Sequence, residues 1–428
     1  MNIMKNDKYI PRVADARLAE SLKSFGAVCV EGPKWCGKTW TALNQAASAC
    51  MIADPTDNFA TRNHVDLDIN YAFQGAEPHL IDEWQEFPAL WDATRYHVDG
   101  NARPGQIILT GSSTPKEKGV MHTGTGRIAS LRLRPMSLWE SGQSEGSVSL
   151  KDICAGADIG VVPVRRPELG EIVELILRGG WPGTMRMPFK YAVKTPVEYV
   201  RQIIEKDIHR VDGIKRDQHK VELLMRSLAR NESTVAGIST LKEDIAGGDG
   251  LEIEENTISS YLDALTRLFV IENQKPFASS LRFGVRLRKA EKRHFCDPSL
   301  AAALLKATPA KLVDDLRTLG FLFESLAERD LRTYAESFGA ELYHYQDYGN
   351  HEIDAVIELS DGRWAAIEVK LGVNQEDAAA ENLKGIRRQL ESAHLRPPEA
   401  LVVVVGLASA AYRRKDGVYV VPLTALKP

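Results

Sequence analysis

Eight residues near the N-terminus combine the residue types and the spacing that a phosphate-binding loop requires. The segment 32–39 has the sequence GPKWCGKT, which matches G-x-x-x-x-G-K-[ST] at every fixed position. An apolar run precedes it at 27–30, and a helical pattern follows it over 40–47. Glycines let successive backbone N–H groups close on phosphates, and the N-terminus of the following helix favours negative charge. The spacing therefore predicts an ATP site.

The side chains of this loop have separate expected roles. Lys38 would reach the β and γ phosphates of the nucleotide, and the hydroxyl of Thr39 would bind Mg²⁺. ATP and Mg²⁺ are therefore the cofactors that we expect. A glycine-containing turn that matches by chance is the alternative, and the strand–loop–helix context counts against it. The predicted nucleotide contacts are Gly32, Pro33, Lys34, Trp35, Cys36, Gly37, Lys38, Thr39, Trp40 and Ser112.

Two adjacent carboxylates end a later apolar run at 79–83, which has the sequence HLIDE. Asp82 is placed to hold Mg²⁺, and Glu83 to orient the water that attacks the γ-phosphate. A helix cap is the alternative for such a pair. Because the pair follows a phosphate-binding loop, it favours hydrolysis of ATP over binding alone.

Two further segments offer polar groups for the γ-phosphate. The apolar run at 106–109 ends in TGSS, where Ser112 would sense the γ-phosphate, and a plain turn is an equally good interpretation of this segment. Arg127 lies on a glycine-rich loop at 124–127 and would act as an arginine finger, in trans if the protein forms a ring. A solvated arginine is the alternative at this position.

Residues 8–140 resemble the AAA-type, archaeal-ATPase-like family of P-loop proteins. The resemblance implies an ATPase with a winged-helix-like insert in the middle of the chain and, by analogy, a homo-oligomeric, hexameric ring. It continues to the C-terminus, into a region known as domain of unknown function 4143. The matching pieces are YIPR at 9–12, VEGPKWCGKTW at 30–40, LIDEWQ at 80–85, LTGSS at 109–113, GTGRIASLRLRPMSLWE at 124–140 and GGWP at 179–182.

The bulk composition is that of a globular protein with several domains. The chain has 428 residues, too many for one ordinary core, and its formal net charge is −4, so a nucleic-acid-binding surface would have to be local. Its five cysteines include no C-x-x-C pair, which favours a reducing compartment. The sequence has neither a signal-peptide pattern nor an apolar run of membrane-span length. We expect a cytoplasmic protein with no membrane partner.

The hydrophobic pattern predicts an α/β protein of several domains. Short apolar runs at 28–30, 50–52, 79–81 and 106–109 alternate with helical patterns, which is typical of a parallel sheet. We expect a P-loop AAA-type ATPase domain at 1–185, a helical lid or linker at 186–218, a winged-helix-like domain at 219–300 and a second α/β domain at 301–428.

A basic segment closes the helical middle of the chain. Residues 281–293 (LRFGVRLRKAEKR) hold six Arg or Lys and one Glu, and apolar residues alternate with arginine over 281–288. One face of a strand with this pattern would be basic, so we expect nucleic acid, DNA above all, to bind here. The alternatives are a solvated edge strand, whose charge deters aggregation, and a winged helix that binds only proteins.

A second group of chemically active residues lies near the C-terminus. Glu368 and Lys370 share one face of a predicted strand at 366–371, and Asp354 lies on another at 351–357. The turn between the strands decides whether these side chains meet. A two-residue turn at 361–362 pairs 354 with 369 and sends Asp354 to the wrong face, whereas a three-residue loop at 360–362 pairs 354 with 368.

Two carboxylates and a lysine on adjacent strands suit metal-assisted hydrolysis of a phosphodiester. Glu324, on a predicted helix at 319–330, would add a carboxylate. The set resembles the PD-(D/E)XK nuclease superfamily, which implies a restriction-endonuclease-like domain with Glu324, Asp354 and Glu368 as metal ligands and Lys370 as a catalytic residue. A salt-bridged edge hairpin is the alternative.

The leading interpretation is an ATPase coupled to the binding or cleavage of nucleic acid, with Glu83, Arg127 and Lys370 as its catalytic residues. The alternative is an ATP-dependent switch or scaffold whose winged helix and C-terminal domain only bind a protein or nucleic-acid partner. A small-molecule kinase is disfavoured, because the Asp82–Glu83 pair suits water activation and nothing in the sequence marks an acceptor pocket.

Overall fold

The computed structural model describes residues 9–114, 123–277, 291–346 and 351–428. The contacts between Cα atoms divide the chain into two compact units, each made of several segments. The first unit comprises Met1–Pro135, Lys206–Lys215 and Asp263–Val270, and the second comprises Met136–Glu205, Arg216–Leu262 and Ile271–Pro428.

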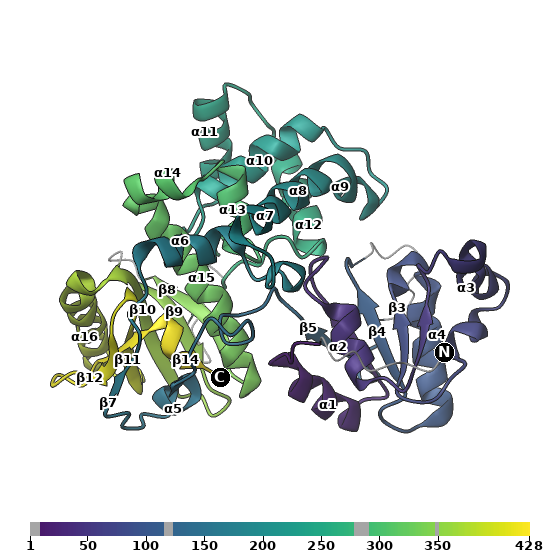
Figure 1. Ribbon diagram of the computed structural model, residues 1–428, viewed down its shortest axis with the longest axis horizontal. Coiled ribbons are helices and arrows are strands. Elements are labelled where there is room, and N and C mark those ends of the chain that lie inside the picture. Colours follow the sequence, from purple (N-terminus) through teal and green to yellow (C-terminus); the bar gives the residue numbers. More distant parts are fainter. Residues whose placement is uncertain (1–8, 115–122, 278–290, 347–350) are drawn as a thin grey trace. The chain divides into compact units, whose positions relative to one another are not determined.

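Five strands form the sheet of the first unit, in the order β2-β3-β4-β1-β5 (Figure 1). Each neighbouring pair is parallel, so the carboxyl ends of all five strands lie along one edge. The predicted parallel sheet is confirmed, and each of the four predicted apolar runs overlaps one of its strands. The strands are β1 (Ala27–Glu31), β2 (Ser48–Met51), β3 (His79–Asp82), β4 (Ile107–Gly111) and β5 (Ile128–Arg132).

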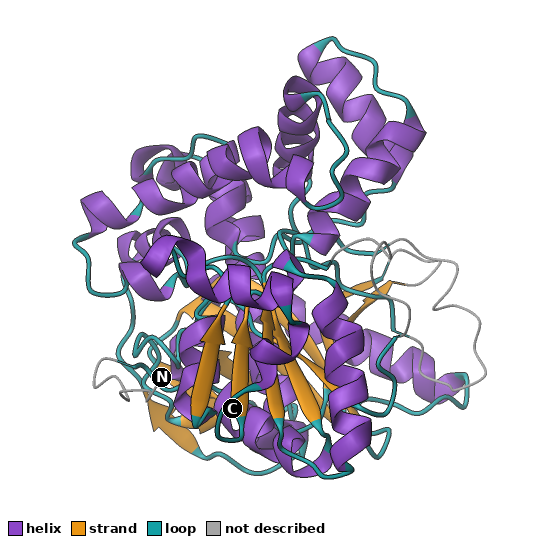
Figure 2. Ribbon diagram, turned by 90° about the vertical axis from the view of Figure 1, so that its right-hand side faces the viewer, coloured by secondary structure: helices purple, strands orange, loops and turns teal. Residues whose placement is uncertain are grey.

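Helices cover both faces of this sheet (Figure 2), because successive side chains of each strand point to opposite sides. Val28 of β1 packs in one core with Leu18 and Ala42, and its neighbour Cys29 packs in another core with Leu90. The helices of this unit are α1 (Ala14–Ser24), α2 (Lys38–Gln45), α3 (Thr56–Leu67), α4 (Ala89–Asn101) and α9 (Ile208–Arg210), together with the end of α12 (Glu255–Arg267).

The second unit contains a mixed sheet of seven strands in the order β7-β12-β13-β11-β10-β9-β8. Strand β10 pairs antiparallel with β9 and parallel with β11, and β11 is also parallel to β13. A two-stranded parallel sheet joins β6 (Val148–Ser149) to β14 (Leu426–Lys427). The seven strands are β7 (Val161–Pro163), β8 (Glu341–Gln346), β9 (Glu352–Glu358), β10 (Trp364–Gly372), β11 (Ala400–Leu407), β12 (Ala410–Arg413) and β13 (Tyr419–Pro422).

Helices α15 (Leu316–Ser337) and α16 (Glu376–Ser392) pack on this sheet, α15 against β8 and β10 and α16 against β10 and β11. Leu383 of α16 shares a core with Trp364, Val403 and Val405 of the strands. The other helices of the second unit are α5 (Leu150–Cys154), α6 (Leu169–Arg178), α7 (Phe189–Ala192), α8 (Lys194–Gln202), α10 (Gln218–Arg230), α11 (Ile238–Asp249), most of α12, α13 (Pro298–Leu304) and α14 (Pro309–Asp314).

A short hairpin connects the helical middle to the C-terminal sheet. Its two arms meet at the antiparallel bridges Ile271–Phe295 and Gln274–Lys292. The first arm then reaches β8, where the amide of Phe277 donates to the carbonyl of His344 at 2.7 Å. Within the second unit, the hairpin that follows α12 is therefore hydrogen-bonded to the edge of the C-terminal sheet.

The division of the chain differs from the domain boundaries that the sequence pattern predicted. The expected ATPase domain, 1–185, is split at Pro135, because β6 and β7 pair with strands from the end of the chain. The expected lid, 186–218, contributes residues to both units, and most of 219–300 shares a unit with 301–428. Periodicity predicts single elements, but it does not reveal which distant strands pair.

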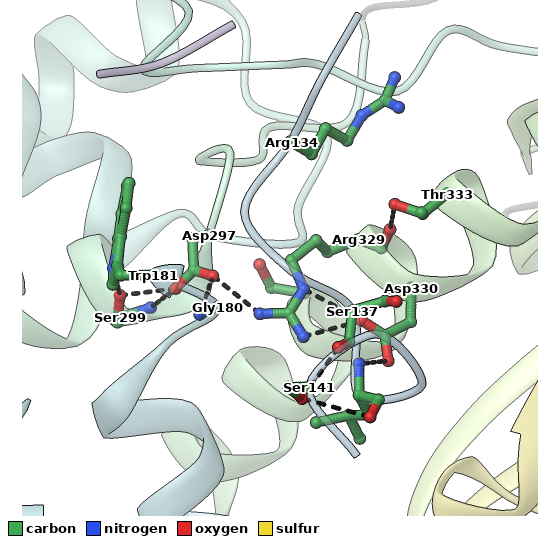
Figure 3. Close-up of polar contacts among 12 residues, drawn as sticks. Arg134, Ser137, Ser141, Gly180, Trp181, Asp297, Ser299, Arg329, Asp330 and Thr333 are labelled. Carbon is green, nitrogen blue, oxygen red and sulfur yellow. Dashed lines mark hydrogen bonds and ion pairs between the residues drawn. The ribbon is translucent and has the colours of Figure 1, made fainter. Parts of the chain in front are cut away.

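A buried arginine connects three segments of the second unit (Figure 3). The guanidinium of Arg329 on α15 donates to Asp297 at 2.8 Å on one side and to Asp330 at 2.8 Å on the other. The carboxylate of Asp297 accepts from the amide of Gly180 at 2.9 Å, and that of Asp330 from the amide of Leu138 at 2.9 Å. The two carboxylates thus hold backbone from two distant parts of the chain around one guanidinium.

This network explains the GGWP segment at 179–182. The carbonyl of Gly180 accepts from the amide of Met136 at 2.6 Å, and a Cβ atom on Gly180 would lie 2.2 Å from the carbonyl oxygen of Met136. The indole of Trp181 donates to Ser299 at 3.0 Å, and the Ser299 hydroxyl donates to Asp297. A glycine is required at 180 because two backbone segments approach so closely there.

Among the residues that the structure describes, no helix combines the length and the apolarity that crossing a membrane requires.

Replacing Arg329 with alanine should strongly destabilise the second unit, because Asp297 and Asp330 would remain buried without their counter-charge. A loss of about 3–5 kcal/mol is expected for breaking a buried pair of this kind. The measurement is the free energy of unfolding in urea, with Arg201→Ala as the control. Arg201 forms an exposed ion pair with Glu198, so its removal should have little effect, and equal losses for the two variants would contradict the assignment.

Candidate functional site

The phosphate-binding loop lies at the carboxyl end of β1, the strand that β4 and β5 flank. It leads into α2 through Gly37, whose φ of 102° lies in the left-handed region that favours glycine. The ammonium of Lys38 donates to the carbonyl of Pro33 at 2.8 Å, so it lies across the loop. The geometry is that of a loop closing on a helix N-terminus, as an anion site requires.

Asp82, the last residue of β3, connects strand β4 and the first turn of α2. Its Oδ1 accepts from the Thr39 hydroxyl at 2.8 Å and from the Thr110 hydroxyl at 2.6 Å. Burial raises the pKa of the Asp82 carboxyl, and the hydrogen bonds from Thr110 and Thr39 oppose that shift. The hydroxyl and the carboxylate that were predicted to hold Mg²⁺ are therefore in direct contact, at one end of the parallel sheet.

Glu83 is held in place by its backbone and by its side chain. Its φ of 58° and ψ of 48° are unusual for a residue other than glycine, and such backbone conformations occur often at functional sites. The amide of Glu83 donates to the Thr110 hydroxyl at 3.0 Å. Its carboxylate accepts from the Ser112 hydroxyl at 3.0 Å and from the amide of Gln85. Glu83 and Ser112, predicted separately, are brought together.

The outer residues of the loop differ in exposure and in their partners. Trp35 and Trp40 are 68% and 48% exposed, so both indoles are available to a ligand. Cys36 is fully buried, and its carbonyl accepts from Arg12 at 2.7 Å. Lys34 forms an ion pair with Asp207 at 2.6 Å, within the first unit. The base of the loop is thus fixed by Arg12, a residue of the YIPR segment.

Arg127 is not brought to this site. It immediately precedes β5, and Ile128 pairs with Ala27 at the amino end of β1, whereas the loop follows the carboxyl end. Five strand residues at ~3.3 Å each separate the two ends by roughly 16 Å. The guanidinium donates instead to Asp99 at 2.8 Å. Arg127 therefore cannot reach a phosphate bound by its own chain, and only the predicted role in trans stays open.

The predicted C-terminal residues do converge, and the turn between their strands has the required length. Ile367 pairs with Ala355, and continuing this register places Glu368 opposite Asp354. The loop contains three residues: the amide of Leu359 donates to the carbonyl of Arg363 at 2.8 Å, and Gly362 has a φ of 78°. Of the two turns that the sequence left open, the structure has the three-residue loop at 360–362.

Two lysines lie among the carboxylates of this region. Lys370 contacts Glu368 at 2.5 Å and Asp354 at 3.2 Å. Lys292, only 1% exposed, contacts Glu324 at 2.5 Å and Glu352 at 3.0 Å. We call these six residues the carboxylate–lysine cluster: Lys292, Glu324, Glu352, Asp354, Glu368 and Lys370.

Burial and charge shift the ionisation of this cluster. The pKa of both Glu324 and Glu368 is raised to about 8, mainly by burial and then by the nearby charge of Asp354, while the lysines oppose this shift. Burial alone would lower the pKa of Lys292 and Lys370, but the carboxylates raise both above the ordinary lysine value. At neutral pH the two lysines are charged, while Glu324 and Glu368 are largely protonated.

The predicted metal ligands Glu324, Asp354 and Glu368 do not have the arrangement of a metal site. In the part of the chain that the structure describes, no group of three or more His, Cys, Asp or Glu side chains is placed to hold a metal ion. The physical reason is the ammonium of Lys292, which already lies between Glu324 and Asp354 at 2.5 and 3.6 Å. The residues meet as predicted, but around a lysine.

Three family models match separate parts of the chain. Residues 24–141 match the AAA domain, residues 169–311 match a domain of unknown function (DUF8612), and residues 319–426 match another domain of unknown function (DUF4143). The chain carries an N-terminal AAA domain. This match coincides with the sheet, the loop and the Asp82–Glu83 pair, and it supports ATPase-like chemistry at this coarse level. The predicted AAA-type domain and C-terminal DUF4143 region are both confirmed.

Two mycobacterial proteins are similar over most of the chain. Uncharacterized proteins of Mycobacterium bovis and Mycobacterium tuberculosis are each 25% identical over 367 residues, which cover 84% of this chain and 73% of theirs. Among solved structures, the Walker-type ATPase PABY2304 of Pyrococcus abyssi aligns with 71% of this chain and 98% of its own, at 17% identity and a TM-score of 0.41.

Sequence reasoning missed several residues of both sites. Thr110 and Gln85 position the carboxylates of the AAA domain, and both belong to segments whose resemblance to the family was noted. Lys292 and Glu352 belong to the C-terminal cluster, where Asn382 of α16 also donates to Glu368 at 2.7 Å. Thr110 and Gln85 lie beside recognised motifs, but no local pattern links Lys292 to Glu324 or Glu352.

Replacing Thr110 with valine should slow ATP hydrolysis, because its hydroxyl bonds both Asp82 and the amide of Glu83. Two hydrogen bonds at about 1 kcal/mol each correspond to a roughly ten- to thirtyfold lower turnover. Thr110→Ser, which keeps the hydroxyl, should stay near the wild-type rate. Steady-state phosphate release measures both variants, and equal rates for valine and serine would remove this hydroxyl from the site.

The raised pKa values in the cluster predict a pH dependence of stability. The folded protein keeps protons on Glu324 and Glu368 that the unfolded chain loses near pH 4.5, so their contribution to stability decreases as pH rises towards 8. The slope is on the order of 1 kcal/mol per pH unit for one such group. The unfolding temperature of Glu324→Gln, measured relative to that of wild type at the same pH, should therefore rise as the pH increases from 5.5 to 8.

The exposed residue Glu174 supplies a control for that comparison. The difference in unfolding temperature between Glu174→Gln and wild type should be the same at every pH. If the difference in unfolding temperature between Glu324→Gln and wild type also does not change with pH, the Glu324 carboxyl does not retain its proton in the folded state.

Proposed function

We propose that the protein is a Mg²⁺-dependent ATPase whose nucleotide cycle controls the binding of nucleic acid by its helical middle and C-terminal domain. The observation that carries the ATPase part is the contact of Asp82 with Thr39 and Thr110, next to a fixed Glu83. These groups lie along the carboxyl edge of a parallel sheet, where such folds bind their ligands.

In this proposal each side chain has a defined part in hydrolysis. Lys38 binds the β and γ phosphates, and Thr39 with Asp82 would hold Mg²⁺, which neutralises charge on the phosphates. Glu83 orients a water and accepts its proton as the water oxygen bonds to the γ-phosphorus. The bond from that phosphorus to the β–γ bridging oxygen breaks, and ADP leaves. Arg127 would stabilise the transferred phosphoryl group only from a neighbouring copy, which makes a ring part of the proposal.

The C-terminal domain is proposed to bind its partner without cutting it. The leading interpretation of the sequence left both binding and cleavage of nucleic acid open. The position of Lys292 among Glu324, Glu352 and Asp354 favours the alternative, a domain controlled by ATP that only binds.

A winged helix and a basic segment are the proposed nucleic-acid contacts. Helices α10, α11 and α12 followed by a hairpin have the order of elements that a winged helix needs. Most of the basic segment, 281–290, lies outside the described residues. Of its last residues, Lys292 is buried and Arg293 donates to the carbonyl of Ala236 at 2.9 Å, so neither is offered to a ligand. The proposal therefore rests on Arg282, Arg286, Arg288 and Lys289.

Replacing Lys38 with alanine should reduce ATP turnover to background, because the main positive charge on the phosphates is lost. Glu83→Gln should instead keep MgATP binding and lower turnover by about a hundredfold or more, since only the base is removed. Turnover by phosphate release and binding by calorimetry separate the two effects. Wild-type turnover in Lys38→Ala would overturn the ATPase proposal.

Replacing Arg286, Arg288 and Lys289 together with glutamine should weaken DNA binding and reduce its dependence on salt. Each lost phosphate contact lowers the slope of log K against log salt by about 0.9 for duplex DNA. Titrations at several salt concentrations measure the slope, and a triple replacement of Arg165, Arg166 and Lys415, which are exposed elsewhere, is the control. An unchanged slope in the first variant would exclude the segment as the binding surface.

A further inference from the structure

Lys292 lies where three carboxylates converge inside the second unit. Its Nζ is 2.5 Å from an oxygen of Glu324, 3.0 Å from one of Glu352 and 3.6 Å from one of Asp354. The side chain is 1% exposed, so its charge has lost nearly all contact with water. A buried ammonium is tolerated only where opposite charges and hydrogen bonds replace that water, and this position provides them.

The carboxylates come from two elements, and the lysine comes from a third. Glu324 lies on α15, while Glu352 and Asp354 lie on β9. Lys292 arrives from the second arm of the hairpin, outside the elements that carry the carboxylates. Oxygen atoms of several carboxylates that face one point are the ligands that hard divalent cations such as Mg²⁺ and Mn²⁺ take in proteins.

The hairpin fixes Lys292 in this position. The backbones of Lys292 and Gln274 exchange two hydrogen bonds, at 2.9 and 3.0 Å. The side-chain amide of Gln274 donates in turn to the carbonyl of Asp354 at 2.9 Å and to that of Tyr343 at 2.7 Å. The strand that supplies the ammonium is therefore tied to the strand that supplies one of its carboxylates.

The rest of the carboxylate–lysine cluster is complete without Lys292. Asp354 uses its second oxygen to accept from the amide of Val369 at 2.8 Å and to contact Lys370 at 3.2 Å. Glu368 contacts Lys370 with one oxygen and accepts from Asn382 with the other. Removing the Lys292 ammonium would leave four carboxyl groups with one lysine: Asp354 would keep its contact with Lys370, and Glu324 and Glu352 would lose their lysine.

We propose that Lys292 serves as the cation of a divalent-metal-type centre in the C-terminal domain, and that this covalently attached ammonium excludes Mg²⁺ or Mn²⁺ from it. The ammonium and a divalent ion would share the same carboxylate oxygens, so the two cannot bind together. In the native chain the centre joins the hairpin to the sheet. Without the ammonium, the same carboxylates take a hard divalent cation.

The test measures the binding of Mn²⁺ to the full-length, nucleotide-free protein. Binding is detected as a loss of the electron paramagnetic resonance signal of free Mn²⁺. Lys292→Gln should bind one additional Mn²⁺ per chain, at least tenfold more tightly than any site of the wild type. Lys292→Arg keeps a positive charge and should bind none in addition. The double variant Lys292→Gln, Asp354→Asn should lose the new site. Any weak binding at the phosphate loop is common to all four proteins.

An unstable Lys292→Gln variant remains informative through its unfolding temperature. A cation that binds only the folded state raises that temperature, so Mn²⁺ should stabilise Lys292→Gln and leave wild type and Lys292→Arg unchanged. Equal Mn²⁺ binding by all variants, or no additional binding and no stabilisation in Lys292→Gln, would overturn the proposal. None of these measurements requires ATP hydrolysis, so they are independent of the proposed function.

Discussion

The second unit depends on one buried guanidinium. Arg329 neutralises Asp297 and Asp330, two carboxylates that are both fully buried, and each of these carboxylates holds a backbone amide from another part of the chain. No member can be removed without leaving a charge or a donor unpaired in a medium of low polarity. Because Leu138 and Gly180 are held in this way, the chain that leaves the AAA domain has a fixed first contact in the second unit.

The segment that leads to Leu138 follows β5, which pairs with the strand that precedes the nucleotide loop. The amide of Leu133 donates to the carbonyl of Glu31 at 2.7 Å, at the end of the strand that carries the loop, and the amide of Met136 donates to Gly180 three residues later. Arg12 also connects the carbonyls of Cys36 and Arg134. Arg12 and the hydrogen bond from Leu133 to Glu31 thus fix the backbone at the end of the first unit's long N-terminal segment beside the nucleotide loop.

Sequence patterns predicted those parts of the fold and of the sites that depend on residues close together in the sequence. The loop, the Asp82–Glu83 pair and the strands of the first sheet follow from residue types within a few positions of one another. Turn chemistry reduced the register of β9 and β10 to two alternatives, and Gly362, with its positive φ, permits the one that the structure has. The partners of Glu324 could not be found in this way, since Lys292 reaches it through a hairpin whose pairing depends on long-range contacts. For the same reason, residues 136–185 were assigned to the ATPase domain, whereas the structure places them in the second unit.

Strand β7 shows where the chain can be divided without breaking a sheet. It pairs with β12 at the edge of the C-terminal sheet, while β6 pairs with β14 at the end of the chain. Both strands lie within 142–168, between the stretches that match the AAA domain and the first domain of unknown function. A fragment that begins at 169 or 319 would lack β7, so the edge of β12 that pairs with it would be exposed. The stretches matched by the family models are thus not the pieces to express separately, because the segment that links them carries two strands that pair with the C-terminal part of the chain.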